Sequence, residues 1–215
     1  MPQVPKAILP AVEMLAADGG RYFGDEMFGE MQGIARCTGL NLGDVVIVNL
    51  FYELNSACTS IVAQRSSDGA IFHGRNLDYG IPGLQNVTMN VAFTRGGDTV
   101  FHTTTYGGYI GALTGMRPGA FSVSLDQRFT PDSPWENAIE ALLHKGKSVG
   151  VALRELLETT DTCVGWRGLC CLSPRHSHAS ALPSVITHTL HAGMPMSSLL
   201  LSHTHCTRAC QCPPF

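Results

Sequence analysis

The stretch CTSIVAQRSSDGAIFHGRNLDYG, from Cys58 to Gly80, decides the fold, because two strand-like segments flank a short polar turn at residues 65–69. These segments carry a thiol at Cys58, a guanidinium at Arg75 and a carboxylate at Asp78. A thiolate is the nucleophilic form of cysteine, and it needs a base or a nearby cation to exist at working pH. Arg75 supplies such a cation and Asp78 can orient the base, so the stretch predicts acyl-transfer chemistry.

The bond between Ala57 and Cys58 bears on the identity of that base. If this bond is broken, the freed α-amino group has a reference pKa of about 7.7 to 8.0 and lies within one residue of its own thiol, so it can act as the general base. Asp78 beside that ammonium and Arg75 beside the sulfur would favour the ion pair of thiolate and cation. The alternative is a buried structural cysteine on a strand, which is the commoner role of an isolated cysteine.

Residues 1–57 show a helical pattern. Asn41 followed by Asp44 can start an apolar helix at 45–54. Nearer the N-terminus, apolar residues recur at helical spacing with Pro10 interrupting, at Ile8, Val12 and Leu15. We expect a helical pro-segment that shields the nucleophile.

From Cys58 to about Gln127 the pattern predicts an antiparallel meander of strands. Apolar and polar residues alternate at 88–93 and at 121–125, and residues 96–98 make a turn. Two helices are expected next. The first has Ser133 as its N-cap and Pro134 as its first helical residue, and the second covers about 149–157. Both should pack on the sheet.

Five segments of this chain resemble one known family. Besides CTSIVAQ and HGRNLDYG, they are VIVNLFYEL at 46–54, GGYIGALTG at 107–115 and PWENAIEALL at 134–143. The chain is similar to the acid ceramidase and N-acylethanolamine-hydrolysing acid amidase family, whose members are N-terminal-nucleophile cysteine hydrolases that cut their own chain immediately before the cysteine. The resemblance runs from Val4 to about Thr160.

The resemblance implies an α+β fold, an αββα sandwich that is incomplete here, with residues 1–57 as the α subunit and 58–160 as the start of the β subunit. It implies that Cys58, Arg75 and Asp78 are catalytic. The implied partners are a lipid amide substrate and the two fragments of the chain, held together after cleavage. The reaction would be hydrolysis of an N-acylethanolamine to a fatty acid and an amine, with no metal or organic cofactor. The alternatives are ceramide hydrolysis, or a truncated product without amidase activity.

Two departures from the family weaken the site. Gln127, in Asp126-Gln127-Arg128, stands where the family has a glutamate, so it can support the site by hydrogen bonding but cannot take a proton. The family's downstream Thr-Asn-Tyr-Asp and Arg-rich motifs are absent from this sequence. His73 and His102 are interpreted as packed or hydrogen-bonded rather than catalytic. The glycines at 107–115 indicate either close approach to substrate or tight turns.

Residues 161–215 differ in composition from the rest. Positions 163–215 contain no Asp, Glu, Lys or Tyr, yet they hold six of the eight cysteines and six of the nine histidines. We interpret this segment as an aberrant, disordered tail that arises from a retained intron or a shifted reading frame. A zinc site built on Cys206, Cys210 and Cys212 with His203 and His205 is the alternative, but the spacing fits no standard C-x-x-C pair, so no metal site is predicted.

Charge and hydropathy argue against two classes of protein, those that bind nucleic acid and those that span a membrane. The net charge of −3 and the absence of a basic run argue against nucleic acid, and no apolar run of about 18 residues predicts a membrane span. A lipid substrate would still require contact with a membrane surface. The family is lysosomal, whereas the start MPQVPKAIL lacks a secretory signal pattern, so retention in the cytosol is the alternative. Asn86 begins an acceptor sequence for N-glycosylation.

Overall fold

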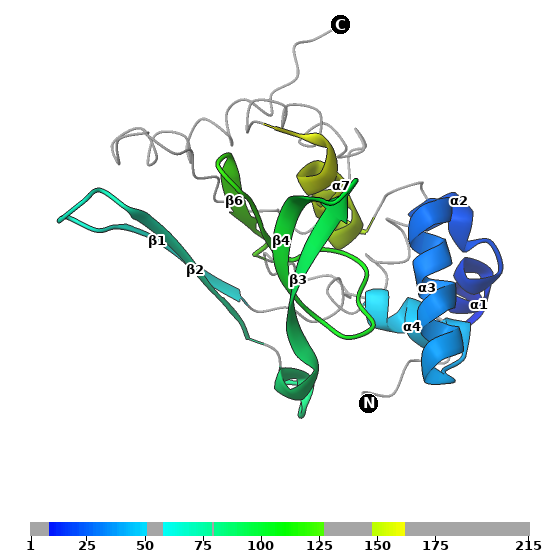
Figure 1. The fold of residues 1–215 in the computed structure, drawn as a ribbon. Coiled ribbons are helices and arrows are strands. Elements are labelled where there is room, and N and C mark those ends of the chain that lie inside the picture. Colours follow the sequence, from blue (N-terminus) through cyan, green and yellow to red (C-terminus); the bar gives the residue numbers. More distant parts are fainter. Residues whose placement is uncertain (1–8, 51–57, 79, 127–147, 162–215) are drawn as a thin grey trace, which may run out of the picture.

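The computed structural model describes residues 9–50, 58–78, 80–126 and 148–161. Helices occupy the N-terminal part, and antiparallel strands and a closing helix follow (Figure 1). The predicted α+β class is therefore confirmed. The elements are α1 (Leu9–Ala17), α2 (Gly19–Phe23), α3 (Asp25–Thr38), α4 (Leu42–Asn49), β1 (Cys58–Gln64), β2 (Ile71–Leu77), the 3-10 helix η2 (Leu84–Val87), β3 (Thr88–Arg95), β4 (Asp98–Tyr106), β5 (Thr114–Arg117), β6 (Phe121–Ser124) and α7 (Val149–Thr159).

The N-terminal helices begin and end at the residues that local chemistry favours. The predicted start of α4 is confirmed, because the Asn41 side chain accepts a hydrogen bond from the amide of Asp44 over 2.8 Å. Pro10 does not interrupt α1, since it lies in the first turn, where a missing N–H costs nothing. Helix α3 ends at Gly39, whose φ of 73° is strained for other residues. Within the described residues, no helix is both long enough and apolar enough to span a membrane.

Strands β3, β4, β5 and β6 form one sheet in that order, all antiparallel, so the predicted meander is confirmed from Thr88 to Ser124 but does not extend back to Cys58. Strands β1 and β2 form a separate hairpin in which Cys58 pairs with Leu77 and Ser60 pairs with Arg75. Figure 1 shows this hairpin extending away from the body of the protein, with one end against the larger sheet.

The hairpin and helix α7 lie on opposite faces of the four-stranded sheet. Because side chains alternate along a strand, neighbouring residues of β6 face opposite ways. Ser122 and Ser124 contact the hairpin, whereas Phe121 and Val123 lie in the core that also contains Leu153 of α7. The resulting order of helix, sheet and hairpin agrees with three of the four layers of the predicted αββα sandwich.

Glycines allow α7 to approach the sheet closely. A Cβ at Gly115 of β5 would lie 2.3 Å from a methyl of Leu157, and one at Gly111 would lie 2.8 Å from the backbone carbon of Gly150. The sequence of this glycine-rich run indicates close approach to substrate or tight turns; at these two positions the structure instead shows close packing against α7.

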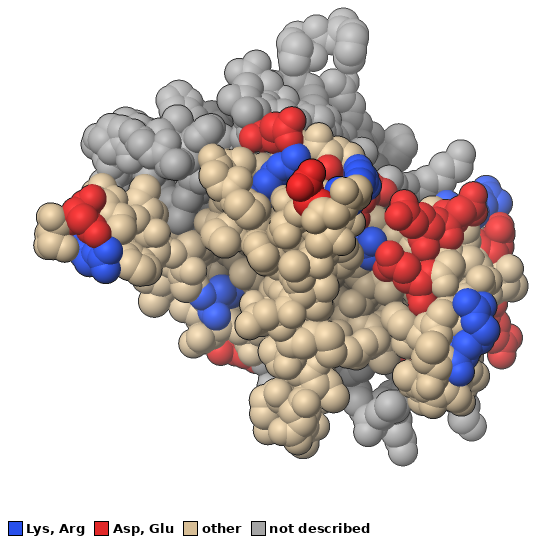
Figure 2. Space-filling model, in the orientation of Figure 1, with Lys and Arg blue, Asp and Glu red and all other residues tan. Residues whose placement is uncertain are grey.

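A core and a buried amide join the N-terminal helices to α7 and to the loop between β4 and β5. The core contains Val12, Val46, Ile110 and Val151, among others. The side chain of Asn49 donates to the carbonyl of Gly108 over 2.9 Å and accepts from the amide of Ile110 over 2.8 Å. Charged side chains of both signs gather over these helices and near α7 (Figure 2).

Candidate active site

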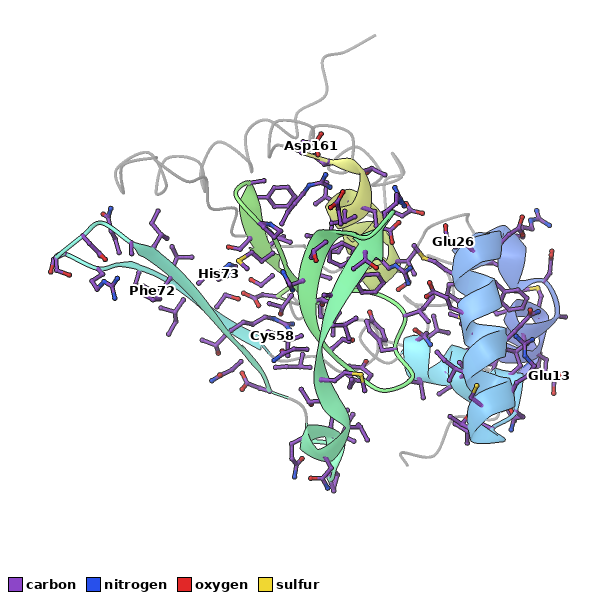
Figure 3. The ribbon with its side chains drawn as sticks, viewed as in Figure 1. Glu13, Glu26, Cys58, Phe72, His73 and Asp161 are labelled. Atoms are coloured by element: carbon purple, nitrogen blue, oxygen red, sulfur yellow. The ribbon has the colours of Figure 1, made fainter. Side chains whose placement is uncertain are left out.

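Cys58 opens β1, and its side chain is half-buried. Nη2 of Arg75 donates a hydrogen bond to the Cys58 sulfur over 3.0 Å. The pleat explains this contact, because Cys58 and Ser60 lie on one face of β1 and Arg75 is paired with Ser60. Figure 3 shows Cys58 at the end of the hairpin nearest the four-stranded sheet. The predicted neighbours Cys58 and Arg75 are thus brought into contact.

The guanidinium of Arg75 is held by the larger sheet. Its side chain is only 5% exposed. Nη2 also donates to the carbonyl of Leu125 over 2.6 Å, and Nη1 donates to the Thr114 hydroxyl over 3.0 Å. The Nε atom faces Oδ1 of Asp126 at 3.7 Å. Arg75 cannot swing into solvent without losing these buried contacts, so its charge is kept at the sulfur.

Asp78 lies at the same end of the hairpin. It directly follows Leu77, the strand partner of Cys58, and its carboxylate accepts a hydrogen bond from the Thr59 hydroxyl over 3.3 Å. The carboxylate is therefore tied to the residue after Cys58, close to the start of β1. This position is compatible with orienting a base at the N-terminal side of Cys58.

The remaining predicted positions fall into two groups. Ala57 and Gln127 lie outside the described residues, as do the helix expected after Ser133 and the segment 163–215. Asn86 lies in η2 and is exposed, so its side chain is accessible. His73 is hydrogen-bonded, as expected, whereas His102 is exposed rather than packed.

Sequence reasoning missed the residues that hold Arg75. Asp126 lies 51 positions along the chain from Arg75, and Thr114 belongs to another strand, so neither contact follows from spacing. One signal was present: a buried arginine needs a carboxylate partner, and Asp126 stands at the end of a predicted strand beside Gln127.

The arrangement favours a reactive thiol. A cation within hydrogen-bonding distance of a sulfur stabilises the thiolate relative to the thiol. Among the described residues, no three His, Cys, Asp or Glu side chains gather closely enough to hold a metal ion. The chemistry that these groups support is nucleophilic attack by sulfur on an electrophilic carbonyl.

Comparison with known proteins identifies relatives, although no family model matches the chain. The chain is 38% identical over 149 residues to the acid ceramidase of Bos taurus, an alignment that covers 62% of this chain and 38% of that protein. It is 37% identical over 169 residues to the N-acylethanolamine-hydrolyzing acid amidase of Caenorhabditis elegans, covering 74% of this chain and 47% of the relative.

Among solved structures, the chain is similar to the Caenorhabditis elegans N-acylethanolamine-hydrolyzing acid amidase (NAAA) ortholog, with 38% identity and a TM-score of 0.45. That match covers 54% of this chain and 49% of the solved one. The chain therefore spans less than half the length of these curated relatives.

Proposed function

We propose, on the premise that the chain is a homologue of the acid ceramidases and N-acylethanolamine-hydrolysing acid amidases, that it hydrolyses fatty-acyl amides with Cys58 as the nucleophile. The observation that carries the proposal is the 3.0 Å contact between Nη2 of Arg75 and the Cys58 sulfur. The predicted family resemblance is confirmed by these relatives; the activity of this chain is our proposal.

The proposed reaction has two halves. The Cys58 thiolate attacks the amide carbonyl, the C–N bond breaks, and the amine leaves with a proton delivered by the α-amino group of Cys58. Water, deprotonated by the same amino group, then attacks the thioester, so the fatty acid is released and the thiolate returns. Asp78 lies near the start of β1, where it would hold the ammonium form of that amine.

In this proposal Arg75 supplies a positive charge that contacts the attacking sulfur. Because Arg75 is fixed by Thr114 and Leu125, this contact requires no rearrangement when substrate binds. A lysine at position 75 would lack the planar fork that makes these contacts together.

The free α-amino group implies cleavage between Ala57 and Cys58. In this step the Cys58 sulfur attacks the Ala57 carbonyl, the peptide nitrogen leaves as the new amine, and water hydrolyses the resulting thioester. Two findings support the proposal: Cys58 is the first residue of β1, and Asn49 of α4 is hydrogen-bonded to the loop between β4 and β5. They would remain attached as the smaller fragment.

The test is intact-mass measurement after incubation at acidic pH. The wild-type chain should give one fragment that begins at Met1 and another that begins at Cys58. The matched control is Cys58→Ala, which should remain intact. Equal cleavage of both proteins would show that an external protease, rather than Cys58, breaks the bond.

For the substrate class, we propose N-acylethanolamines ahead of ceramide. The acid amidase aligns with 169 residues of this chain, whereas the bovine acid ceramidase aligns with 149. Both substrates present a fatty-acyl amide, so the same thiolate chemistry serves either. We further propose that the protein acts in the lysosome and contacts a membrane surface to reach its lipid substrate.

A further inference from the structure

A chain of hydrogen bonds runs from the hairpin into the four-stranded sheet beside Cys58. Nε2 of His73 lies 3.0 Å from the hydroxyl of Ser124, which lies 2.8 Å from the hydroxyl of Ser60. The Ser60 hydroxyl in turn lies 2.9 Å from Oδ1 of Asp126. On the other side of the imidazole, Nδ1 of His73 lies 2.9 Å from the Ser122 hydroxyl. Figure 3 shows His73 on the hairpin, farther from its sheet end than Cys58.

The carboxylate at the end fixes the direction of every hydrogen in this chain. A carboxylate only accepts, so Ser60 must donate its one hydroxyl hydrogen to Asp126. Ser60 then has only lone pairs left for Ser124, so Ser124 donates to Ser60. Because the single hydroxyl hydrogen of Ser124 is donated to Ser60, Nε2 of His73 must carry a proton and donate it to the Ser124 oxygen. The order of donation is His73, Ser124, Ser60 and Asp126.

The chain ends at the cation that contacts the candidate nucleophile. Oδ1 of Asp126, the oxygen that Ser60 binds, is also the oxygen 3.7 Å from Nε of Arg75. That Nε is buried and has no hydrogen-bond acceptor among the described residues, so the Asp126 carboxylate is the group that faces it. Rotation of the carboxylate would therefore change the environment of the guanidinium whose other end touches Cys58.

We propose that His73, Ser124, Ser60 and Asp126 are positioning residues for the Cys58–Arg75 pair. The hydrogen-bonded chain fixes one oxygen of Asp126 against Nε of Arg75, and the guanidinium is thereby kept with Nη2 on the sulfur. This inference rests on the proposed role of Cys58, but it concerns the state of the thiol rather than turnover. If the same bonds only anchor the hairpin to β6, breaking them should leave the pH dependence of Cys58 alkylation unchanged.

The test is the pH dependence of Cys58 alkylation by iodoacetamide, followed by mass spectrometry of the peptide that contains Cys58. Ser60→Ala breaks the chain without changing any charge. We expect the midpoint of the alkylation profile to rise by about one unit, which is a roughly tenfold loss of thiolate at a fixed pH below the midpoint. An unchanged midpoint in folded Ser60→Ala protein would overturn the proposal.

Asp126→Asn separates positioning from direct charge effects by the sign of the shift. If Asp126 acts only as a negative charge near the sulfur, its removal lowers the midpoint, because a like charge disfavours the thiolate. If it positions Arg75, the midpoint rises, as in Ser60→Ala. The matched control is Thr104→Val, which removes an exposed hydroxyl bond to Asn90 in the same sheet. It should leave the midpoint unchanged.

A second measurement needs no variant. Nitrogen-15 NMR of the imidazole should show His73 protonated at Nε2, either as that neutral tautomer or as the cation. A neutral His73 with a bare Nε2 would overturn the deduced direction of donation. These readouts are independent of amide hydrolysis: absent turnover with a shifted midpoint would reject the proposed function alone, and turnover with an unshifted midpoint would reject the positioning chain alone.

Discussion

Loss of the buried Arg154 ion-pair network should weaken the attachment of the N-terminal helices to α7 and lower the stability of the fold. Arg154 of α7 is 3% exposed, and its two Nη atoms bind both carboxylate oxygens of Glu30 in α3, over 2.5 and 2.7 Å. Its Nε binds Glu158 over 2.8 Å, and Nη1 also donates to the carbonyl of Ile110 over 2.9 Å. The guanidinium additionally lies 4.6 Å from the ring centroid of Phe93.

The loss in the free energy of unfolding depends on which charged side chain is left without a partner. Burial acts to lower the pKa of Arg154, but hydrogen bonds and charge from Glu30 and Glu158 outweigh it and raise the pKa above its ordinary value. Its contribution to stability is therefore complete at every pH below the ordinary arginine value and is lost only as the pH rises through the raised one. Variants, rather than pH, must test the network.

We expect Glu30→Gln to lower the free energy of unfolding by about 1–2 kcal/mol, because Glu30 is 39% exposed and Arg154 keeps Glu158. The double variant Glu30→Gln with Glu158→Gln leaves a buried cation unpaired and should cost about 3–5 kcal/mol. Arg154→Met should cost less than the double variant, because the carboxylates that it leaves are nearer to solvent.

The assay is urea denaturation followed by far-ultraviolet circular dichroism. Free energies are compared only between proteins whose free energy of unfolding falls with urea concentration at the same slope. Arg95, which lies 3.8 Å from Glu158 and has a side chain that is 66% exposed, provides the matched control. Arg95→Gln should change the free energy by less than about 0.5 kcal/mol. A double variant as stable as the wild type would refute the reasoning that this network joins the helices to α7.

Three further predictions concern packing and the hairpin turn. Gly115→Ala should lower the free energy of unfolding by about 1–3 kcal/mol, measured by urea denaturation, because its Cβ would lie 2.3 Å from Leu157; a gain in stability would contradict the packing. Asn49→Leu should lower the free energy of unfolding by about 2–5 kcal/mol in the same assay, since it leaves the carbonyl of Gly108 and the amide of Ile110 unpaired. An unchanged free energy in this variant would mean that the two hydrogen bonds do not stabilise the fold. Arg65 lowers the pKa of Asp68 by hydrogen bonding, so any stabilisation is present above the ordinary aspartate pKa and is lost as the pH falls through the lowered value. Both side chains are exposed, so Asp68→Asn should leave the thermal midpoint at neutral pH unchanged.

Local chemistry made part of this fold predictable. The cap at Asn41 depends on residues three apart, and the hairpin depends on the polar turn after Gln64, so both could be read from neighbouring residues. The contact between Arg75 and Cys58 follows from the same hairpin register.

The contacts between layers were not predictable in this way. Asp126 and Ser124 come within reach of Ser60 only when the hairpin packs on β6, and no spacing in the sequence specifies which face of the sheet receives it. The ion pair of Glu30 and Arg154 spans 124 positions and has no local signal. Charged residues of this kind are ordinarily interpreted as exposed, and only tertiary packing shows that Arg154 is buried.

Fatty-acid release from an N-acylethanolamine at acidic pH, measured for the wild-type chain and for Cys58→Ala, tests the central claim most directly. We expect release by the wild type, slower release from ceramide, and none above background with Cys58→Ala. Arg75→Lys should lie between them, since it keeps a charge but loses the fork that holds Thr114, Leu125 and the sulfur together. Equal release by wild type and Cys58→Ala, or no release by the self-cleaved wild-type chain, would contradict the assignment of Cys58 as the nucleophile of a fatty-acyl amide hydrolase.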